Sequence, residues 1–288
     1  MPWGSTISAG RLYVVATPIG NLEDITLRAL RILGEVDIVA AEDTRSAGHL
    51  FARHAVTVKE LTSFFEGNEA QRADQLVERM RGGAQVAVIS EAGMPGVSDP
   101  GQRLVARAVE AGIPVTVIPG ASAAITAVVG SGLPTDAFAF VGFPPRDAGP
   151  RRELFGRLRA LPFTLIFYES PARTAATLAD LRDAFGGDRR AVVCRELTKM
   201  FEESVRGTLD ELTIRYAEAD PRGEVTLVVA PAGPETVAVT DVEAEVRRRL
   251  QAGEGAKEIA AAVAVLTGKP RRQIYQLALA LSGKKGDG

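Results

Sequence analysis

Short apolar runs alternate along the chain with segments in which apolar residues recur at helical spacing. The stripe of Ala73, Leu76, Val77 and Met80 is one such helical segment. Alternation of this kind is typical of an α/β fold in which helices cover a mostly parallel sheet. The pattern predicts strands at Leu12–Ala16, Ile38–Ala41, Gln85–Ser90, Val115–Ile118, Phe138–Gly142, Thr164–Tyr168, Ala191–Arg195, Ser204–Arg206 and Glu224–Ala230.

Three short motifs predict where helices begin. Asp99-Pro100 and Ser170-Pro171 each put a capping residue before a proline, which suits the first position of a helix. Thr208 and Glu211 have the spacing of a capping box.

The segment 143–150 is the best linker, because its prolines and Gly149 continue neither a helix nor a strand. After residue 232 the strand pattern ends and three helical patterns follow: Val242/Val246/Leu250, Ile259/Val263/Leu266 and Ile274/Leu277/Leu281. The last two are joined by Thr267-Gly268-Lys269-Pro270, which resembles a helix-turn-helix. We therefore expect α/β domains at 11–143 and 150–232, and a small helical region at 239–282.

Composition narrows the class of protein. The 288 residues are 46% hydrophobic and 24% charged, which is ordinary for a globular protein. No apolar run approaches the roughly 20 residues of a membrane span. Residues 1–10 lack the basic and apolar regions of a signal peptide, and the single cysteine, Cys194, permits no internal disulfide. We expect a cytoplasmic protein without a membrane segment.

Charge and histidine content limit the partners. A net charge of −2 argues against indiscriminate nucleic-acid binding, although local basic clusters could contact RNA or simply face solvent. His49 and His54 lie five apart with no cysteine nearby, so no metal site is predicted. The basic clusters are Arg151, Arg152, Arg157 and Arg159, and then Lys269, Arg271, Arg272, Lys284 and Lys285.

Loops after the predicted strands could hold a ligand, since ligands of parallel sheets gather at the carboxyl ends of the strands. The loop 17–24 contains neither a dinucleotide fingerprint nor a P-loop. The loop Ser90–Gly101 has three glycines and two prolines, which favours recognition by main-chain groups, although a plain tight turn is the alternative. Ser122 follows another strand and can cap a helix.

Charged clusters follow three other strands, at 41–45, 168–173 and 195–203. Each could be a structural ion pair. Because all three are expected at the same edge of the sheets, together they favour a shared polar site.

Six motifs occur in a fixed order and resemble one known family. They are Ala16–Thr26, Ala41–Arg45, Ser90–Gly101, Pro119–Ala123, Tyr168–Arg173 and Arg195–Glu203. Together they resemble the tetrapyrrole methylase superfamily and, within it, the bacterial enzymes that methylate the 2'-oxygen of a cytidine in 16S ribosomal RNA. The resemblance covers about Arg11 to Ala232. It implies two α/β domains with S-adenosylmethionine in the cleft between them, a homodimer, and 16S rRNA within the 30S subunit as the partner.

The resemblance also implies which residues bind the cofactor. In this chain Glu91 and Met94 stand where the family more often has Asp and Thr, which puts side-chain contacts at these two positions in doubt. Main-chain recognition would survive this change. The cofactor-binding candidates are Pro18, Gly93, Met94, Pro95, Gly96, Val97, Ser122 and Ala123 from the first domain, and Tyr168, Leu197 and Pro231 from the second.

Methyl transfer to a hydroxyl needs alignment of the acceptor and a group that manages its proton or charge. Lys199 is the first candidate, either as a desolvated base or as a cation beside the oxyanion; a salt bridge with Glu202 or Glu203 is the structural alternative. The other catalytic candidates are Glu42, Asp43, Arg45, Glu169 and Glu196.

RNA binding would draw on Arg45, Arg173 and the two basic clusters, with the target base drawn out of its stack. The segment Gly255–Leu281 could add RNA contacts or only cover a dimer. Two rival functions remain: a methyltransferase acting on a corrin or porphyrin precursor, with a diphthine-synthase-like enzyme as a weaker variant, and a non-catalytic ribosome assembly factor that keeps the cofactor pocket.

Overall fold

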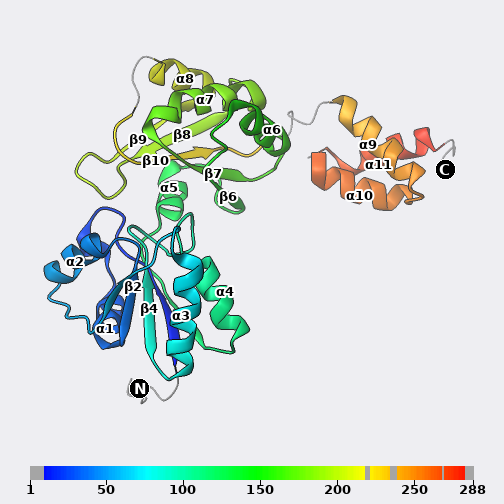
Figure 1. Cartoon of the computed structure of the whole chain (residues 1–288). Coiled ribbons are helices and arrows are strands. Elements are labelled where there is room, and N and C mark those ends of the chain that lie inside the picture. The colour runs from blue at the N-terminus through cyan, green and yellow to red at the C-terminus, as the bar shows by residue number, and fades with distance from the viewer. Residues whose placement is uncertain (1–9, 218–220, 234–238, 268, 283–288) are drawn as a thin grey trace.

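The computed structural model describes residues 10–217, 221–233, 239–267 and 269–282, without the side chains of 239–241, 265 and 266. The predicted leader up to residue 9, the side chain of Leu266, the turn residue Gly268, and Lys284 and Lys285 lie outside the described residues. The described residues form two five-stranded sheets with their helices and a separate group of C-terminal helices (Figure 1).

The first sheet is parallel throughout and has the strand order β3-β2-β4-β1-β5. Tyr13, in the interior strand β1, lies between Ala87 of β4 and Thr116 of β5. The short polar strand β3 was not predicted, because three residues give no readable periodicity. The strands are β1 (Arg11–Val15), β2 (Ile38–Ala41), β3 (Leu61–Ser63), β4 (Gln85–Ile89) and β5 (Val115–Ile118).

Helices cover both faces of this sheet, so its central strands are apolar on both sides. Tyr13 and Val15 belong to the core packed on α1 and α2, whereas Leu12 and Val14 belong to the core packed on α3 and α4. The predicted stripe of α3 is confirmed, since all four of its residues are buried. The elements are η1 (Leu22–Asp24), α1 (Leu27–Glu35), α2 (Thr44–Arg53), α3 (Glu69–Arg81) and α4 (Gln102–Glu110).

The second sheet is mixed, and here the prediction of a mostly parallel sheet is wrong. Its order is β6-β7-β10-β8-β9, and only β6 and β7 pair in parallel. β8 and β9 are joined by the short loop 196–202, which is too short for a parallel crossover. The strands are β6 (Phe138–Gly142), β7 (Thr164–Glu169), β8 (Arg190–Arg195), β9 (Glu203–Thr208) and β10 (Val225–Val229).

The helix α5 (Ala123–Ser131) connects the two sheets. It precedes the proposed domain boundary at 143, yet it packs on β7, β8 and β10 of the second sheet. Ile19 from the first domain joins the same apolar cluster, which therefore binds the domains together. Figure 1 shows α5 between the two sheets. The opposite face of the second sheet is covered by α6 (Ala148–Leu158), α7 (Pro171–Phe185) and α8 (Leu209–Tyr216).

Two of the three predicted helix starts are confirmed. Thr208 forms the capping box with Glu211, and Ser170 is the N-cap residue before Pro171 of α7. The third prediction is wrong: α4 begins at Gln102, two residues after Pro100. Its N-cap is Gly101, with a φ of 136°, a backbone conformation open to glycine, so Asp99 remains in the loop.

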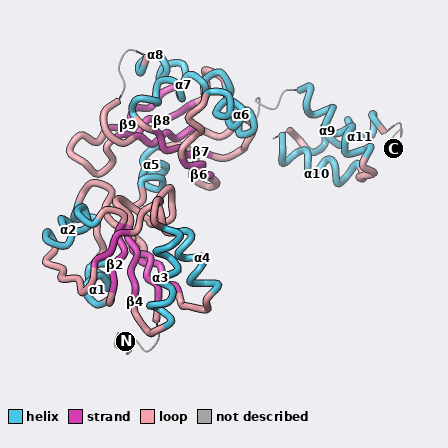
Figure 2. The backbone as a smooth tube through the Cα atoms, viewed as in Figure 1, coloured by secondary structure: helices cyan, strands magenta, loops and turns pink. Residues whose placement is uncertain are grey.

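Three C-terminal helices form a small core of their own: α9 (Val239–Gln251), α10 (Ala256–Thr267) and α11 (Arg271–Leu281). Val242, Val246, Ile259, Val263 and Ile274 are buried against one another, which confirms the three helical patterns. In Figure 2 this region is drawn as helices joined by loops, beside the second domain. The residue ranges 11–143, 150–232 and 239–282 stay predictions as domain limits.

Some functional features are absent from the described part of the chain. None of its helices is long and apolar enough to cross a membrane. It also contains no group of three or more His, Cys, Asp or Glu side chains arranged to hold a metal ion.

Candidate active site

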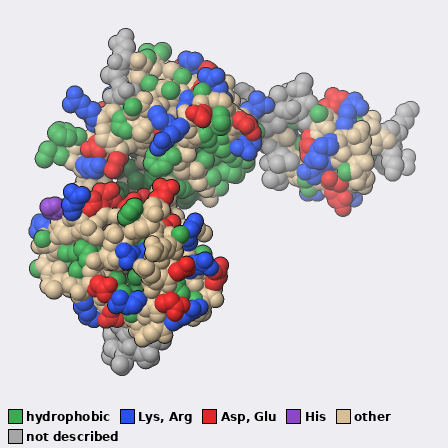
Figure 3. Space-filling model, viewed as in Figure 1, with side chains coloured by type: hydrophobic (Ala, Val, Ile, Leu, Met, Phe, Trp, Pro, Cys, Tyr) green, Lys and Arg blue, Asp and Glu red, His purple; other side chains and the backbone are tan. Residues whose placement is uncertain are grey.

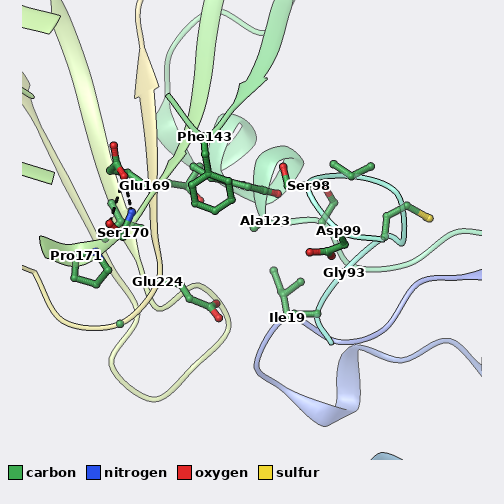
Figure 4. A pocket seen from close by; sticks show the side chains of 18 residues that line it. Ile19, Gly93, Ser98, Asp99, Ala123, Phe143, Glu169, Ser170, Pro171 and Glu224 are labelled. Atoms are coloured by element: carbon green, nitrogen blue, oxygen red, sulfur yellow. Dashed lines mark hydrogen bonds between the residues drawn. The ribbon is translucent and has the colours of Figure 1, made fainter. Parts of the chain in front are cut away.

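A cavity of about 370 Å³ opens where the first domain meets the second. Its walls are largely apolar, and we call it the apolar cavity. In Figure 4, Ile19, Gly93 and Asp99 lie on one side, and Phe143, Ser170, Pro171 and Glu224 on the other. The residues that characterise it are Ile19, Met94, Val97, Phe143, Tyr168 and Val225.

The loop Ser90–Gly101 forms the first-domain wall and has a defined backbone. Thr17 and Gly93 exchange two backbone hydrogen bonds, of 2.9 and 3.2 Å, which tie this loop to the end of β1. A turn closes when Val97 N–H donates to the Met94 carbonyl at 3.2 Å. Ser98 has a φ of 65°, a strained conformation for a residue other than glycine. The loop is therefore preformed beside the cavity.

Aromatic residues form the opposing wall. The Tyr168 hydroxyl accepts a 3.2 Å hydrogen bond from the backbone N–H of Ala124, at the start of α5. The rings of Phe140 and Phe143 meet Tyr168 edge-on, at centroid distances of 4.7 and 5.6 Å. Burial raises the pKa of Tyr168, so its hydroxyl stays neutral. This wall is apolar and fixed.

A second cavity of about 400 Å³ lies next to the first and shares Ile19, Ala92 and Glu224 with it. Its lining is more polar than that of the apolar cavity, and we call it the polar cavity. Acidic side chains gather on the face of the first domain that looks toward the second (Figure 3). The polar groups of this cavity include Thr17, Asp43, Ser46, His49, Glu91 and Lys199.

Lys199 lies in the polar cavity within an ion-pair network. Its Nζ is 3.0 Å from Glu196 Oε1 and 3.2 Å from Glu224 Oε2, so Lys199 does form a salt bridge, but with other partners than the alternative of Glu202 or Glu203. Burial alone would lower the pKa of Lys199, but the hydrogen bonds to Glu196 and Glu224 outweigh it and the pKa is raised. The amine is therefore held in its charged form.

The close approach of the two domains at Lys199 requires a glycine. A Cβ on Gly20 would overlap Cγ of Lys199 and lie 3.1 Å from Thr198 Oγ1. Gly20 also has a φ of 148°. The stem of Lys199, from the second domain, thus rests directly on the backbone of the first-domain loop.

Asp99 is a cavity residue that the sequence analysis assigned to a helix start. Burial, chiefly, and the charges of Glu42, Glu91 and Glu224 raise its pKa to about 6, against a hydrogen bond from Ser90 that lowers it. Asp99 lines the apolar cavity, and Figure 4 shows it on the same side as Ile19, a residue that lines both cavities. A carboxylate of this pKa can exchange a proton near neutral pH.

The other catalytic candidates differ in their hydrogen-bond partners and in whether they line a cavity. Asp43 lines the polar cavity and caps α2, where hydrogen bonds from the backbone N–H groups of Arg45 and Ser46 lower its pKa. Glu42 accepts from Glu91 N–H at 3.1 Å. Arg45 is exposed at the start of α2. Glu42, Arg45 and Glu196 are not among the residues lining either cavity.

Glu169 borders the apolar cavity but its carboxylate is fully buried and already bound. Ser170 N–H donates to it at 2.8 Å, Thr177 Oγ1 at 2.6 Å, and Arg173 lies 3.2 Å away. Its hydrogen bonds therefore connect the end of β7 to α7.

The cofactor-binding candidates fall into three groups. Those that line the apolar cavity are Gly93, Met94, Val97, Ser122, Ala123 and Tyr168. Pro18 lines the polar cavity instead. Pro95, Gly96, Leu197 and Pro231 border neither cavity, and Leu197 is buried in the cluster around α5.

Two arginines proposed for RNA contact are engaged inside the protein. Arg151 is 6% exposed and lies 2.6 Å from Asp180, to which Arg152 also binds. Arg173 donates to the carbonyls of Pro144 and Pro145. The expectation that Arg151 faces RNA is therefore wrong, because its side chain is buried against Asp180. Arg173 holds the linker, and its contact with RNA stays a prediction.

Sequence reasoning missed several cavity residues: Ile19, Ser98, Asp99, Phe143 and the segment 223–226. Asp99 had a readable signal, an acidic residue inside the Gly/Pro-rich loop. Phe143 and Glu224 had no such signal. Phe143 belongs to a linker and Glu224 directly precedes β10, and only folding brings these segments to the cleft.

A family model described as "Tetrapyrrole (Corrin/Porphyrin) Methylases" matches residues 11–213, which include both sheets except β10. The chain belongs to the tetrapyrrole methylase family. The prediction of the family and of a two-domain α/β fold is therefore confirmed. The methylase is a methyltransferase.

Three relatives of the methylase are each named "Ribosomal RNA small subunit methyltransferase I". The protein from Mesorhizobium japonicum is 45% identical, with 96% of this chain and 94% of the relative aligned. The protein from Micromonospora olivasterospora is 46% identical, with 97% and 90% aligned. The protein from Pseudomonas aeruginosa is 44% identical, with 96% and 100% aligned.

Solved structures share the fold. The uroporphyrin-III-C-methyltransferase of Thermus thermophilus is 25% identical with a TM-score of 0.55, over 77% of this methylase and 94% of that chain. A cobalt precorrin-4 methyltransferase is 18% identical with a TM-score of 0.58, over 80% and 98%. Another structure of the Thermus enzyme, at 22% identity, TM-score 0.54 and coverage of 77% and 97%, is complexed with S-adenyl homocysteine.

Proposed function

We propose that this methylase transfers the methyl group of S-adenosylmethionine to the 2'-oxygen of a cytidine ribose in 16S ribosomal RNA. The observation that carries the proposal is the pair of joined cavities, one apolar and one polar, in a chain 44–46% identical to proteins named for the small-subunit RNA. The apolar cavity would hold the cofactor and the polar cavity the ribose of the acceptor.

The apolar cavity fits the cofactor in shape and chemistry. Tyr168, Phe143 and Ile19 offer apolar surface for the adenine, and the loop at 93–97, tied to Thr17 by backbone hydrogen bonds, forms the wall of the first domain. The carboxylates of Asp99 and Glu224 suit a positively charged sulfur. When bound, S-adenosylmethionine supplies an electrophilic methyl group. Pro95, Gly96, Leu197 and Pro231 would support these walls from behind.

Asp99 and Lys199 would act on the acceptor hydroxyl in two different ways. With a pKa of about 6, Asp99 is mostly ionised at neutral pH and would accept the hydroxyl proton as the ribose oxygen bonds to the methyl carbon and the bond from sulfur to that carbon breaks, leaving S-adenosylhomocysteine. Lys199, held in its charged form, would stabilise negative charge on that oxygen. Glu196 and Glu224 would orient the lysine rather than act on the substrate.

The charge of the cleft restricts how RNA enters. Asp43, Glu91 and Glu224 line the polar cavity, so phosphates would be repelled there while a ribose and its base would not. We therefore expect an extruded nucleotide in the cleft, with the RNA backbone outside it.

The quaternary assembly is part of the proposal. Three large apolar residues are exposed and could be covered by a second copy in a homodimer: Val117 of the edge strand β5, 53% exposed, and Ile125 and Val129 of α5, 49% and 70% exposed. If the substrate is RNA within the 30S subunit, the methylase would act in the cytoplasm. Light scattering of the purified protein tests the dimer.

The decisive experiment incubates the protein and labelled S-adenosylmethionine with 30S subunits from a strain lacking the enzyme, then maps the label by nuclease digestion and mass spectrometry. Label on a cytidine ribose is expected. Label on a porphyrin precursor supplied in parallel, or cofactor binding without any transfer, would overturn the proposed substrate and the proposed catalysis respectively.

A further inference from the structure

The loop between β8 and β9 carries two large apolar side chains at its tip. Met200 is 90% exposed and its neighbour Phe201 is 67% exposed. They are the central residues of a turn in which Glu202 N–H donates to the Lys199 carbonyl at 3.1 Å. Such positions usually carry Gly, Asn, Asp or Pro, so two large apolar residues here require an explanation other than turn formation.

The base of this loop is firmly held. Lys199 N–H donates to the Glu196 carbonyl at 3.0 Å, and Thr198 N–H donates to Glu202 Oε2 at 2.6 Å. Leu197 is buried in the core beneath. Glu196 and Thr198 have φ values of 51° and 68°, costly conformations that persist only where the surroundings enforce them. The fold thus presents Met200 and Phe201 on a rigid support.

The tip lies at the rim of the polar cavity. Lys199, adjacent to Met200, lines that cavity and touches Gly20 of the first domain. In Figure 1 the β8–β9 loop extends toward the side of the cleft where α2 lies, and Figure 3 shows hydrophobic side chains projecting there above basic ones. Arg45, exposed at the start of α2, adds positive charge on this side.

We infer that Met200 and Phe201 form a wedge that stacks on RNA bases beside the nucleotide whose ribose enters the polar cavity. The inference rests on the proposed function. A nucleotide drawn out of its stack leaves neighbours with exposed faces, and apolar or aromatic side chains inserted there replace the lost stacking. The polar cavity takes the sugar, the wedge contacts the bases, and the phosphates remain outside the cleft, where Arg45 is exposed.

The test compares the wild type with Phe201→Ala, Phe201→Trp and the double variant Met200→Ala/Phe201→Ala. Single-turnover transfer of label to unmethylated 30S subunits should fall at least about tenfold in the double variant, since stacking on one base is worth that much. Phe201→Trp should retain transfer, because it keeps an aromatic face. The affinity for S-adenosylmethionine, measured by calorimetry, should not change.

Ile214→Ala is the matched control, because Ile214 is also apolar and 75% exposed but lies on α8 outside both cavities. Normal transfer by the double variant would overturn the wedge while leaving the proposed function intact. Conversion of a wild-type dimer into a monomer by the double variant would also overturn it, since the tip would then contact a second copy. Absence of transfer by the wild type would instead overturn the proposed function.

Discussion

Asp99 shows how one residue can have its role changed by its surroundings. In the sequence it precedes a proline and looks like a helix cap, but Gly101 begins the helix and Asp99 is left in the cavity wall. Partial burial and three nearby carboxylates then raise its pKa to about 6. The same side chain on the surface would be an ordinary carboxylate.

We expect the rate of methyl transfer to depend on the ionisation of Asp99. If it accepts the hydroxyl proton, the single-turnover rate should fall about tenfold for each pH unit below 6 and level off above it. Asp99→Asn should lower the rate by about 100-fold or more and remove this pH dependence. A normal rate in Asp99→Asn would exclude the assignment.

Stability measurements on the same variant separate misfolding from lost chemistry. The folded-state pKa of Asp99 is raised from 3.8, so its ionisation opposes folding, and this loss of stability develops as pH rises from about 4 to about 6. Asp99→Asn should therefore be more stable than wild type at pH 7.5, by roughly 1 kcal/mol after allowing for solvent screening, and no more stable at pH 3.5. Urea unfolding at the two pH values measures this difference.

Lys199 offers a second test of a single residue. Lys199→Ala should reduce transfer by about 100-fold while cofactor affinity is retained, because the cation faces the polar cavity rather than the apolar one. Lys59→Ala is the matched control, since Lys59 also pairs with a carboxylate, Asp37, but lies away from both cavities. Equal transfer by the Lys199 and Lys59 variants would contradict the role of the cation.

At the scale of elements, the loops following β1 and β8 are fitted to one another. Gly20→Ala should be destabilising for two reasons, its φ of 148° and the overlap of the new Cβ with Lys199. We expect a loss of about 1–3 kcal/mol in unfolding free energy together with slower transfer. Gly83→Ala is the control: its φ of 97° is also unfavourable, but nothing lies within 4 Å of the new Cβ. Slower transfer in both variants would argue against a specific contact at Gly20.

The elements also differ in how well the sequence predicted them. Strands with continuous apolar runs, such as β4 and β10, were found within one residue at each end, because burial on both faces leaves an unambiguous pattern. β3 was missed because it is short and half-buried. Part of the pairing direction in the second sheet was wrong because β10 inserts between β7 and β8, and nothing local in the sequence specifies that neighbour. The antiparallel pair of β8 and β9 did have a local signal, the short loop between them.

At the scale of the whole molecule, the cavities are complete before the C-terminal helices begin. Every residue lining the apolar and polar cavities precedes residue 227, and α9, α10 and α11 have a separate core. A chain ending at residue 233 should bind S-adenosylmethionine with unchanged affinity by calorimetry. A large loss of affinity would show that these helices support the cleft, and a selective loss of transfer to 30S subunits would assign them to RNA contact.

The sequence by itself determined the family, the two α/β domains and most of the cavity loops, because six ordered motifs and strongly apolar strands are local features of the chain. Only the tertiary structure decided which charged residues meet. It pairs Lys199 with Glu224 rather than Glu202 or Glu203, engages Arg151 with Asp180, and brings Asp99 to the cleft. These contacts join residues distant in the chain, and their energies depend on burial and distance, which no local pattern encodes.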